Sequence, residues 1–451
     1  MTKPTSTIKS LFKHSEIELH GFPESILNDS PETSGVAIGA CEGKPLIDTS
    51  MYPVSVLGSA RSGKTSCCII PSLLTWRESA IVVDVNSETY GATEPWRRTH
   101  AHNKIRCVNF GDPNSPDTFN FLDAIPWDGS DYDHPDHAVW SLAESLLDES
   151  PNNQDCPIDD FWHHHSRSLL ILLIWSTHIR LKNKACLPDV QQLVINDAEF
   201  AETILAWRNS TAQTNRELFL KELAESYAKQ DEPVRAAVRE MVVNSLAIFG
   251  TADAIHTTSK STFDASELLD IDPTTVYLTF KSVTAKSVRP LIRIFIDQVV
   301  GLRMRSRKYS PHEAPHLLLA LDDYSAIDYI GTVEKHIMDL QYYGIKPLVA
   351  LQRLATQSHI GLWEQCSTKV VLSIRDPETA FNVAEVGKMS ELDLPKSQLM
   401  AIDDADELVL GASELPIFVK KFPYYKDADM LAKLGSSYDR REQASGQSWA
   451  F

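Results

Sequence analysis

The chain has 451 residues, of which 43% are hydrophobic and 23% are charged. This balance is typical of a globular protein with a large core, and it excludes the disordered, collagen-like and disulfide-scaffold classes. The net charge of −18 disfavours a protein that coats duplex DNA through bulk electrostatics, although local basic surfaces are compatible with it. The length fits about two to four domains, or one large α/β domain with an insertion.

The sequence predicts neither secretion nor a membrane span. Residues 1–22 lack the apolar core of about 7 to 15 residues that a signal peptide has. The longest apolar run, residues 169–175, is far shorter than the roughly 20 residues needed to cross a bilayer. The seven cysteines are scattered and form no CxxC pair, which indicates reduced thiols in a cytoplasm. We therefore expect a cytoplasmic protein without a transmembrane segment.

The first chemical motif follows a short β-rich run at residues 54–57 and precedes a predicted helix at residues 66–70. Its sequence, GSARSGKT, has the spacing of a Walker A loop, in which glycines let backbone N–H groups approach a phosphate. We expect Lys64 to reach the β- and γ-phosphate oxygens and the Thr65 hydroxyl to bind Mg²⁺. A chance glycine turn is the alternative, but the strand–loop–helix context favours nucleotide binding. The predicted nucleotide-binding residues are Gly58, Ser59, Ala60, Arg61, Ser62, Gly63, Lys64 and Thr65.

A second apolar strand is predicted at residues 80–84, at the spacing of a βαβ unit and hence of a parallel sheet. Asp84 would then lie at the carboxyl end of a strand, where α/β sheets bind ligands. Asp84 and Glu88 are therefore candidates for positions near the site. A solvated acid at a strand end explains Asp84 equally well.

From about Asp136 to Asp264 the apolar residues follow helical periodicity, and strand patterns are absent. We interpret this stretch as a helical insertion whose two ends enter the α/β domain side by side. The three histidines at residues 163–165 suggest a metal site. Consecutive helix positions point about 100° apart and cannot converge on one ion, so we interpret them as part of a solvated or packed face.

A continuous apolar strand at residues 316–321 ends in Asp322 and Asp323, which is a Walker B pattern. Phosphoryl transfer to water needs one carboxylate on Mg²⁺ and a group that orients the attacking water. We assign the metal to Asp322 and the water to Asp323. A further strand at residues 346–351 ends at Gln352, which is placed to sense the γ-phosphate, although a simple strand-end hydrogen bond is the alternative. The predicted catalytic residues are Lys64, Asp322, Asp323 and Gln352.

These motifs, together with Phe161-Trp162, Tyr343-Gly344-Ile345 and the run at residues 376–380, resemble in order the type IV coupling proteins of conjugation and type IV secretion. The resemblance runs from about Val54 to Asp427. It implies a RecA-like P-loop NTPase domain of α/β class, with a parallel-rich central sheet and an inserted all-α domain that meets cargo. It also implies ATP and Mg²⁺ as cofactors and a ring, expected to be a hexamer when active.

The domains expected from the pattern and the resemblance are an N-terminal segment (1–50), the RecA-like domain (51–135 and 268–432), the all-α domain (136–267) and a C-terminal tail (433–451). The implied partners are DNA, with single strands favoured, relaxase or relaxosome or effector proteins, and inner-membrane components of the secretion system. The implied place is the bacterial cytoplasm, with peripheral contact to the inner membrane. The family usually begins with a transmembrane hairpin, so the chain resembles a member without that domain.

Two further departures from the family concern catalysis. Asp323 stands where the family usually has glutamate, which puts the efficiency of hydrolysis in question. Ring ATPases commonly supply a cation from the neighbouring subunit to the γ-phosphate. No residue stands out for this role, and Lys346 and Arg375 are the candidates. A basic group is either a phosphate-contacting patch or, as we favour, the solvated end of a helix beginning near Pro290; its members are Arg303, Arg305, Arg307 and Lys308.

Two alternative functions remain open at this point. One is a RecA-like DNA-translocating motor unrelated to secretion, which would share both Walker motifs. The other is a nucleotide-gated adaptor with little ATPase activity, which the Asp322-Asp323 pair keeps under consideration. ATP turnover measured with and without single-stranded DNA distinguishes the adaptor from either motor.

Overall fold

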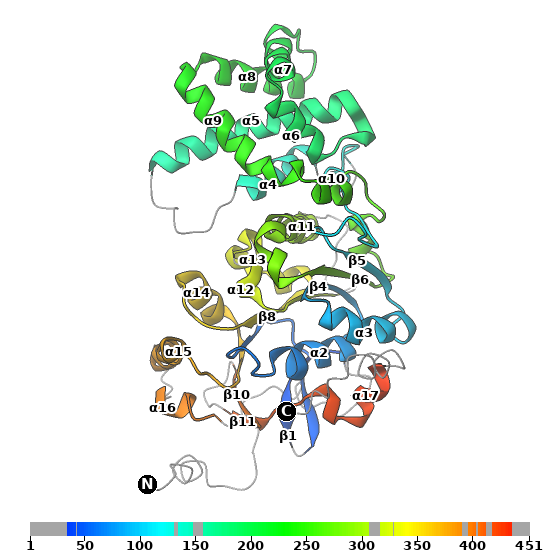
Figure 1. The fold of residues 1–451 in the computed structure, drawn as a ribbon, viewed down its shortest axis with the longest axis vertical. Coiled ribbons are helices and arrows are strands. Elements are labelled where there is room, and N and C mark those ends of the chain that lie inside the picture. The colour runs from blue at the N-terminus through cyan, green and yellow to red at the C-terminus, as the bar shows by residue number, and fades with distance from the viewer. Residues whose placement is uncertain are drawn as a thin grey trace.

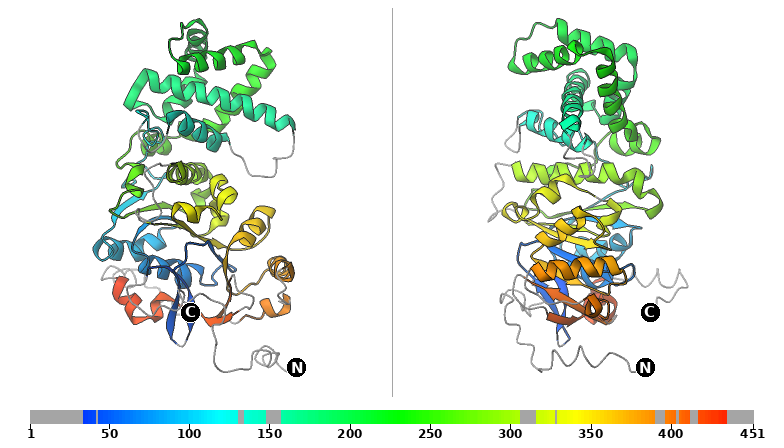
Figure 2. Two further views of the ribbon diagram at one scale, coloured as in Figure 1. Left: turned by 180° about the vertical axis from the view of Figure 1, so that it is seen from behind. Right: turned by 90° about the vertical axis from the view of Figure 1, so that its left-hand side faces the viewer.

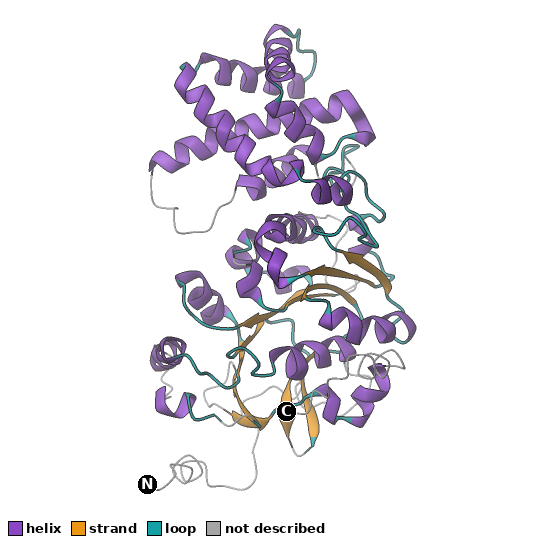
Figure 3. Cartoon of the chain, viewed as in Figure 1, coloured by secondary structure: helices purple, strands orange, loops and turns teal. Residues whose placement is uncertain are grey.

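The structure, a computed structural model, describes residues 34–41, 43–129, 134–147, 157–305, 316–327, 329–389, 396–402, 405–411 and 417–434. Most of the expected N-terminal segment, Arg307, Lys308 and the chain from residue 435 lie outside these residues. Within them, the strands all lie in the lower part of the molecule and the upper part contains helices (Figures 1 and 3). The same separation is seen from behind and from the side (Figure 2).

One eleven-stranded sheet forms the base of the molecule, and its strand order is β2-β1-β11-β10-β9-β3-β8-β7-β4-β6-β5. From β9 to β5 neighbouring strands pair parallel, whereas β10, β11, β1 and β2 pair antiparallel. The predicted parallel-rich α/β fold is therefore confirmed. The strands are β1 (Val36–Cys41), β2 (Lys44–Asp48), β3 (Val54–Leu57), β4 (Ser79–Val85), β5 (Lys104–Val108), β6 (Thr274–Phe280), β7 (Leu317–Leu321), β8 (Ile345–Leu351), β9 (Thr368–Val371), β10 (Asp406–Leu410) and β11 (Ile417–Lys420).

Helices cover both faces of the sheet, and the strand side chains alternate between them. Ala80 and Val82 of β4 join the apolar cluster that includes helix α2, whereas Ile81 and Val83 join the cluster that includes α11. The helices are α2 (Ile70–Thr75), α3 (Glu88–Thr99), α4 (Pro135–Leu147), α5 (Pro157–Leu181), α6 (Leu187–Ile195), α7 (Asp197–Asn209), α8 (Asn215–Lys229), α9 (Glu232–Leu246), α10 (Ala252–Thr258), α11 (Ala285–Arg305), α12 (Tyr324–Ile327), α13 (Gly331–His336), α14 (Gln357–Gln365), α15 (Pro377–Met389), α16 (Lys396–Leu399) and α17 (Ala428–Leu434).

The upper part consists of α4 to α10, and the described residues between α4 and α10 contain no strand. Its central element is the 25-residue helix α5, which packs against α4, α6, α8 and α9 through the buried apolar run at residues 169–175. The histidines at residues 163–165, on the same helix, lie next to three different groups: Glu144, Arg167 and Gln230. No helix among the described residues has the length and apolarity required to cross a bilayer.

The sequence favours a solvated helix end for the basic group at the end of α11, and this is wrong for Arg303. This residue is completely buried, and its guanidinium donates to the carbonyl oxygens of Tyr343 (2.8 Å) and Leu268 (3.0 Å). A guanidinium has several N–H donors and can hold backbone carbonyls of distant segments. The helical pattern of the sequence gives no sign of such contacts. Arg303 therefore has a structural role, and Arg305 beside it is half-buried. The helix also begins at Ala285, before the expected Pro290.

Two chain segments connect the strands with the helical part, and they pair with each other at a neck. The N–H of Phe119, on the outgoing segment, donates to the carbonyl of Thr257 (2.9 Å). The N–H of Thr262, on the returning segment, donates to the carbonyl of Thr118 (3.0 Å). The segments that lead to and from the helical part therefore lie side by side at this point.

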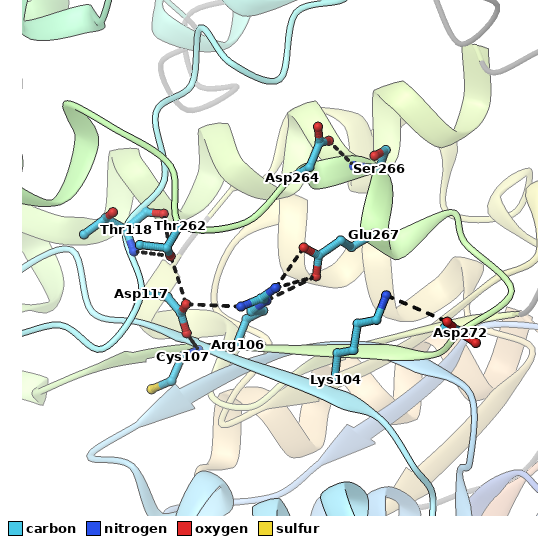
Figure 4. Close-up of polar contacts among 10 residues, drawn as sticks. All are labelled: Lys104, Arg106, Cys107, Asp117, Thr118, Thr262, Asp264, Ser266, Glu267 and Asp272. Atoms are coloured by element: carbon cyan, nitrogen blue, oxygen red, sulfur yellow. Dashed lines mark hydrogen bonds and ion pairs between the residues drawn. The ribbon is translucent and has the colours of Figure 1, made fainter.

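Arg106 of β5 fastens this neck, as Figure 4 shows. Its guanidinium contacts Glu267 on the returning segment (2.8 Å) and lies 3.7 Å from Asp117 on the outgoing one. The same Asp117 carboxylate accepts a hydrogen bond from the Thr262 hydroxyl (2.9 Å). One cation thus joins both connections to an edge strand of the sheet.

We expect Arg106→Met to lower the free energy of unfolding by about 1–2 kcal/mol, because half-buried hydrogen bonds to carboxylates are lost. Arg98→Met is the matched control, since Arg98 forms an exposed i,i+4 pair with Glu94 and such pairs contribute roughly 0.3–0.5 kcal/mol. Urea unfolding followed by circular dichroism measures both. Equal effects of the two substitutions would show that the neck contact adds no stability.

Candidate nucleotide site

The phosphate-binding loop, residues 58–65, leaves the end of β3 and wraps back on itself. Arg61 (φ 62°) and Gly63 (φ 101°) have left-handed backbone conformations, which only glycine adopts without strain. A Cβ on Gly58 would lie 2.5 Å from the Oγ of Ser62, so a side chain there would collide with the loop itself. These two glycines are therefore required by the loop geometry, as its sequence predicts.

Lys64 lies inside this loop and is nearly buried, with 7% of its surface exposed. Its ammonium donates to the carbonyl oxygens of Gly58 (2.7 Å) and Ser59 (3.2 Å). Burial lowers the pKa of Lys64, while the negative charges of Asp322 and Asp323 act in the opposite direction. The cation and the two carboxylates therefore share one small polar site.

The Thr65 hydroxyl donates a 2.7 Å hydrogen bond to Oδ2 of Asp322, across a sequence separation of 257 residues. Strand β8 lies between the strands that carry these two residues, so both are at the carboxyl edge of the sheet. Burial raises the pKa of Asp322 to about 6, although the Thr65 hydrogen bond and the Lys64 charge lower it. The two predicted Mg²⁺ ligands are thus in direct contact.

Asp323 has a left-handed backbone (φ 56°), a conformation that Asp tolerates better than most residues. Burial raises its pKa, whereas the Lys64 charge and a hydrogen bond from Gln352 lower it. Its Oδ1 is buried and has no hydrogen-bond partner in the described part of the chain. Gln352 is half-buried and follows β8. The four residues predicted as catalytic therefore lie together.

Asp84 is neither solvated nor a direct member of the site. It is completely buried at the end of β4, and its carboxylate accepts from the N–H groups of Thr89 (3.2 Å) and Tyr90 (2.6 Å) at the start of α3. Burial raises its pKa to about 7, while the two backbone hydrogen bonds lower it and the charges of Asp322 and Glu88 raise it further. Asp84 thus anchors α3 close to the site.

The pKa of Asp84 predicts a specific pH dependence of stability. Because its ordinary value of 3.8 is raised to about 7 in the folded state, its contribution is fully present below about pH 4 and is lost as the pH rises through 7. Asp84→Asn keeps an oxygen acceptor and does not titrate. Urea unfolding of both proteins from pH 4 to 8 should show the variant gaining stability relative to wild type up to about pH 7; a constant difference would contradict this assignment.

Lys346 is not available as a cation for a neighbouring subunit, so that expectation is wrong. It is completely buried on β8, its ammonium lies 3.3 Å from Oδ2 of Asp48, and it donates to the carbonyl of Asp48 (3.1 Å). Burial lowers its pKa and Asp48 acts against this. Arg375 is exposed. Its backbone N–H donates to the Oγ of Ser59 (2.8 Å), which places this residue beside the loop of its own chain.

Sequence reasoning missed Lys421, whose ammonium donates to the carbonyl of Ser62 in the loop (2.8 Å). It also missed Glu407, a buried carboxyl near Cys67 of the π-helical turn Thr65–Ile69; burial is the main cause that raises the pKa of this thiol, and Glu407 adds to it. Lys421 directly follows β11, a strand of only four residues, and no motif in the sequence marks it. Both residues belong to the antiparallel end of the sheet.

Comparison with solved structures supports the fold. Plasmid coupling protein TrwB in complex with ADP and Mg²⁺ has a TM-score of 0.60 and 16% identity, with 89% of this chain and 91% of that chain covered. TrwB in complex with the ATP analogue ADPNP has a TM-score of 0.60 and 17% identity, with 88% and 90% covered. At this identity the likeness concerns the fold.

Sequence relatives include a conjugal transfer protein and protein VirD4. Conjugal transfer protein TraG of Escherichia coli is 24% identical over 334 residues, which are 70% of this chain and 51% of TraG. Protein VirD4 of Agrobacterium fabrum is 22% identical over 433 residues, 84% of this chain and 59% of VirD4. The chain thus spans little more than half the length of these relatives. The family model described as type IV secretory system conjugative DNA transfer matches residues 28–361, well over half of the chain, and the chain belongs to that family.

Proposed function

We propose that the chain binds ATP with Mg²⁺, hydrolyses it, and thereby helps to move substrates to a type IV secretion channel. The observation that carries this proposal is the 2.7 Å hydrogen bond from Thr65 to Asp322. It brings the Walker A hydroxyl and the Walker B carboxylate to the point where one Mg²⁺ would contact both. Lys64 lies close enough for both carboxylates to shift its pKa.

The residues present fit ATP with Mg²⁺. No group of three or more His, Cys, Asp or Glu among the described residues is placed to hold a metal ion. Mg²⁺ in nucleotide sites needs only one or two carboxylates, because phosphates and water complete its octahedron. One hydroxyl and one carboxylate therefore suit Mg²⁺ that arrives with a nucleotide. The ligands named for TrwB, an ATP analogue and ADP with Mg²⁺, have the same chemistry.

Each site residue then has a distinct task. Lys64 exchanges the carbonyls of Gly58 and Ser59 for phosphate oxygens, so that its charge is preorganised for the charge that develops in phosphoryl transfer. The unpartnered Oδ1 of Asp323 orients the attacking water, and Gln352 links that carboxylate to the end of β8. Thr65 and Asp322 would hold Mg²⁺, which would supply positive charge that offsets the charge of the phosphates.

We also propose the domain organisation expected from the sequence, with residues 51–135 and 268–432 as the nucleotide-binding domain and 136–267 as an all-α domain. The helical part between the paired segments of the neck supports this division. Strands β1 and β2 extend the sheet to residues 36–48, so the sheet begins earlier than residue 51. Residues 1–50 are proposed as an N-terminal segment and residues 433–451 as a C-terminal tail.

The partners proposed are single-stranded DNA, relaxase or effector proteins, and inner-membrane components of a type IV secretion system. The family description and the relatives in conjugal transfer support the first of these. A homo-oligomer, hexameric when active, would allow a cation to act on the neighbouring subunit's nucleotide. Arg375 remains the candidate for this cation, because it is exposed whereas Lys346 is buried.

ATP turnover of the purified full chain, measured with and without single-stranded DNA, tests the proposal. We expect Mg²⁺-dependent binding of ATP and hydrolysis that rises with DNA. Tight binding without hydrolysis under both conditions would instead support the nucleotide-gated adaptor. Failure to bind ATP at all would contradict the proposed function.

A further inference from the structure

The last two strands of the sheet form a hairpin whose two faces differ. Strands β10 and β11 pair antiparallel, with Glu407 opposite Val419. Lys421 directly follows β11, and its backbone N–H continues the pairing by donating to the carbonyl of Ala405 (3.1 Å), so alternation puts its side chain on the same face as these two residues. Lys420 lies on the other face, opposite Asp406, with which it forms an exposed ion pair. Two adjacent lysines thus have separate surroundings.

Lys421 reaches the phosphate-binding loop from outside. It is half-buried, and its ammonium donates a 2.8 Å hydrogen bond to the carbonyl of Ser62. The carbonyls of Gly58 and Ser59 are held by Lys64, a member of the loop itself. The loop is therefore held by two cations, and only one of them belongs to the Walker A motif.

The peptide that Lys421 contacts joins Ser62 to Gly63. A trans peptide is planar, and its C=O and N–H point in opposite directions. With the carbonyl held toward the hairpin, the N–H of Gly63 points to the inner side of the loop, where such loops present donors to a phosphate. Gly63 has a φ of 101°, and glycine restricts the rotation of its peptide less than other residues do. The hydrogen bond from Lys421 therefore restricts the rotation of this peptide.

The nearby carboxyl of Glu407 does not compete with the loop for the Lys421 ammonium. Glu407 is completely buried, and neither of its carboxyl oxygens has a hydrogen-bond partner among the described residues. Burial raises the pKa of Glu407 well above its ordinary value, and the charge of Lys421 acts in the opposite direction. The raised pKa favours a neutral carboxyl, which does not draw the ammonium away from Ser62.

We propose that Lys421 is a positioning residue for nucleotide binding, which holds the Ser62 carbonyl so that the N–H of Gly63 faces the phosphate. The inference rests on the proposed function, since it requires that the loop binds ATP. Lys421 lies beyond residue 361, where the family match ends, so the match itself assigns it no role. The antiparallel hairpin thereby becomes part of the nucleotide site.

The test compares Lys421→Met with Lys420→Met in the full chain. We expect Lys421→Met to raise the Kd for a non-hydrolysable ATP analogue with Mg²⁺ about tenfold, as the loss of a charged hydrogen bond predicts. KM for ATP rises with it, while kcat at saturating ATP changes little. Lys421→Arg, which keeps a cationic donor, restores most of the affinity, and Lys420→Met binds like wild type. Thermal unfolding without nucleotide verifies that each variant is folded.

Equal Kd values for Lys421→Met and Lys420→Met would overturn the inference, as would a loss of kcat without a change in KM. If Lys421→Met does not fold, Lys421→Gln is measured by the same criterion. Wild-type protein that binds no ATP would overturn the proposed function as well. Wild-type binding that is lost in Lys64→Ala but retained in Lys421→Met would overturn only the role of Lys421.

Discussion

Lys64→Ala is expected to reduce kcat/KM for ATP by at least about 100-fold, the order of effect found when one preorganised charge-stabilising donor is removed. The change removes the cation that lies between the loop carbonyls and the carboxylates of Asp322 and Asp323. It removes no apolar core volume, so the fold is expected to survive. Steady-state turnover and binding of an ATP analogue measure the effect.

Lys184→Ala is the control, because Lys184 is exposed on the helical part. It should leave turnover unchanged. Circular dichroism and thermal unfolding of both variants separate a lost charge from a lost fold. Turnover by folded Lys64→Ala at the wild-type rate would place the phosphates away from this loop.

Asp323→Asn is expected to slow hydrolysis by roughly 10²- to 10⁴-fold while ATP binding is retained, because a positioned base or water-orienting group contributes that range. Asn occupies left-handed backbone conformations as readily as Asp, so the φ of 56° at this position is preserved. The substitution therefore changes the charge and leaves the turn intact. Single-turnover hydrolysis together with the Kd for ATP separates the two effects.

Asp339→Asn is the control for the lost negative charge, since Asp339 has 60% of its side chain exposed and its carboxylate lies 3.8 Å from the imidazole of His336. It should hydrolyse ATP at the wild-type rate. If Asp323→Asn also does so, another group orients the water, and the shorter reach of Asp at this position would have no catalytic consequence.

The parallel core of the sheet could be predicted because its strands are buried on both faces. Such strands appear in the sequence as continuous apolar runs, as β7 with its five apolar residues illustrates. The Walker loop and the acids of β7 follow these runs directly, and the carboxyl ends of parallel strands share one edge. Strand runs and motif spacing together were therefore enough to place Lys64, Thr65 and Asp322 in one site.

The sequence pattern does not predict strands β1, β2 and β5, whereas the β-like run at residues 407–411 does predict a strand, which is β10. Strand β5 alternates charged and apolar residues, with Lys104 and Arg106 on one side. Strand β1 has an irregular register with β2, and β2 contains Pro45. The buried pairing of Lys346 with Asp48 depends on this edge hairpin, and long-range partners of this kind leave no local signal. The same reason concealed Lys421.

The position of β3 has a consequence for synthesis of the protein. This strand carries the predicted phosphate-binding loop but pairs with β8 and β9, which are made roughly three hundred residues later. Contacts of such long sequence separation form late, because the loop-closure entropy must be met first. A nascent chain on the ribosome therefore has no nucleotide site until Val371 has emerged. Until then the apolar strand β3 lacks one or both of the strands that pair with it, and it is the segment that a chaperone would hold.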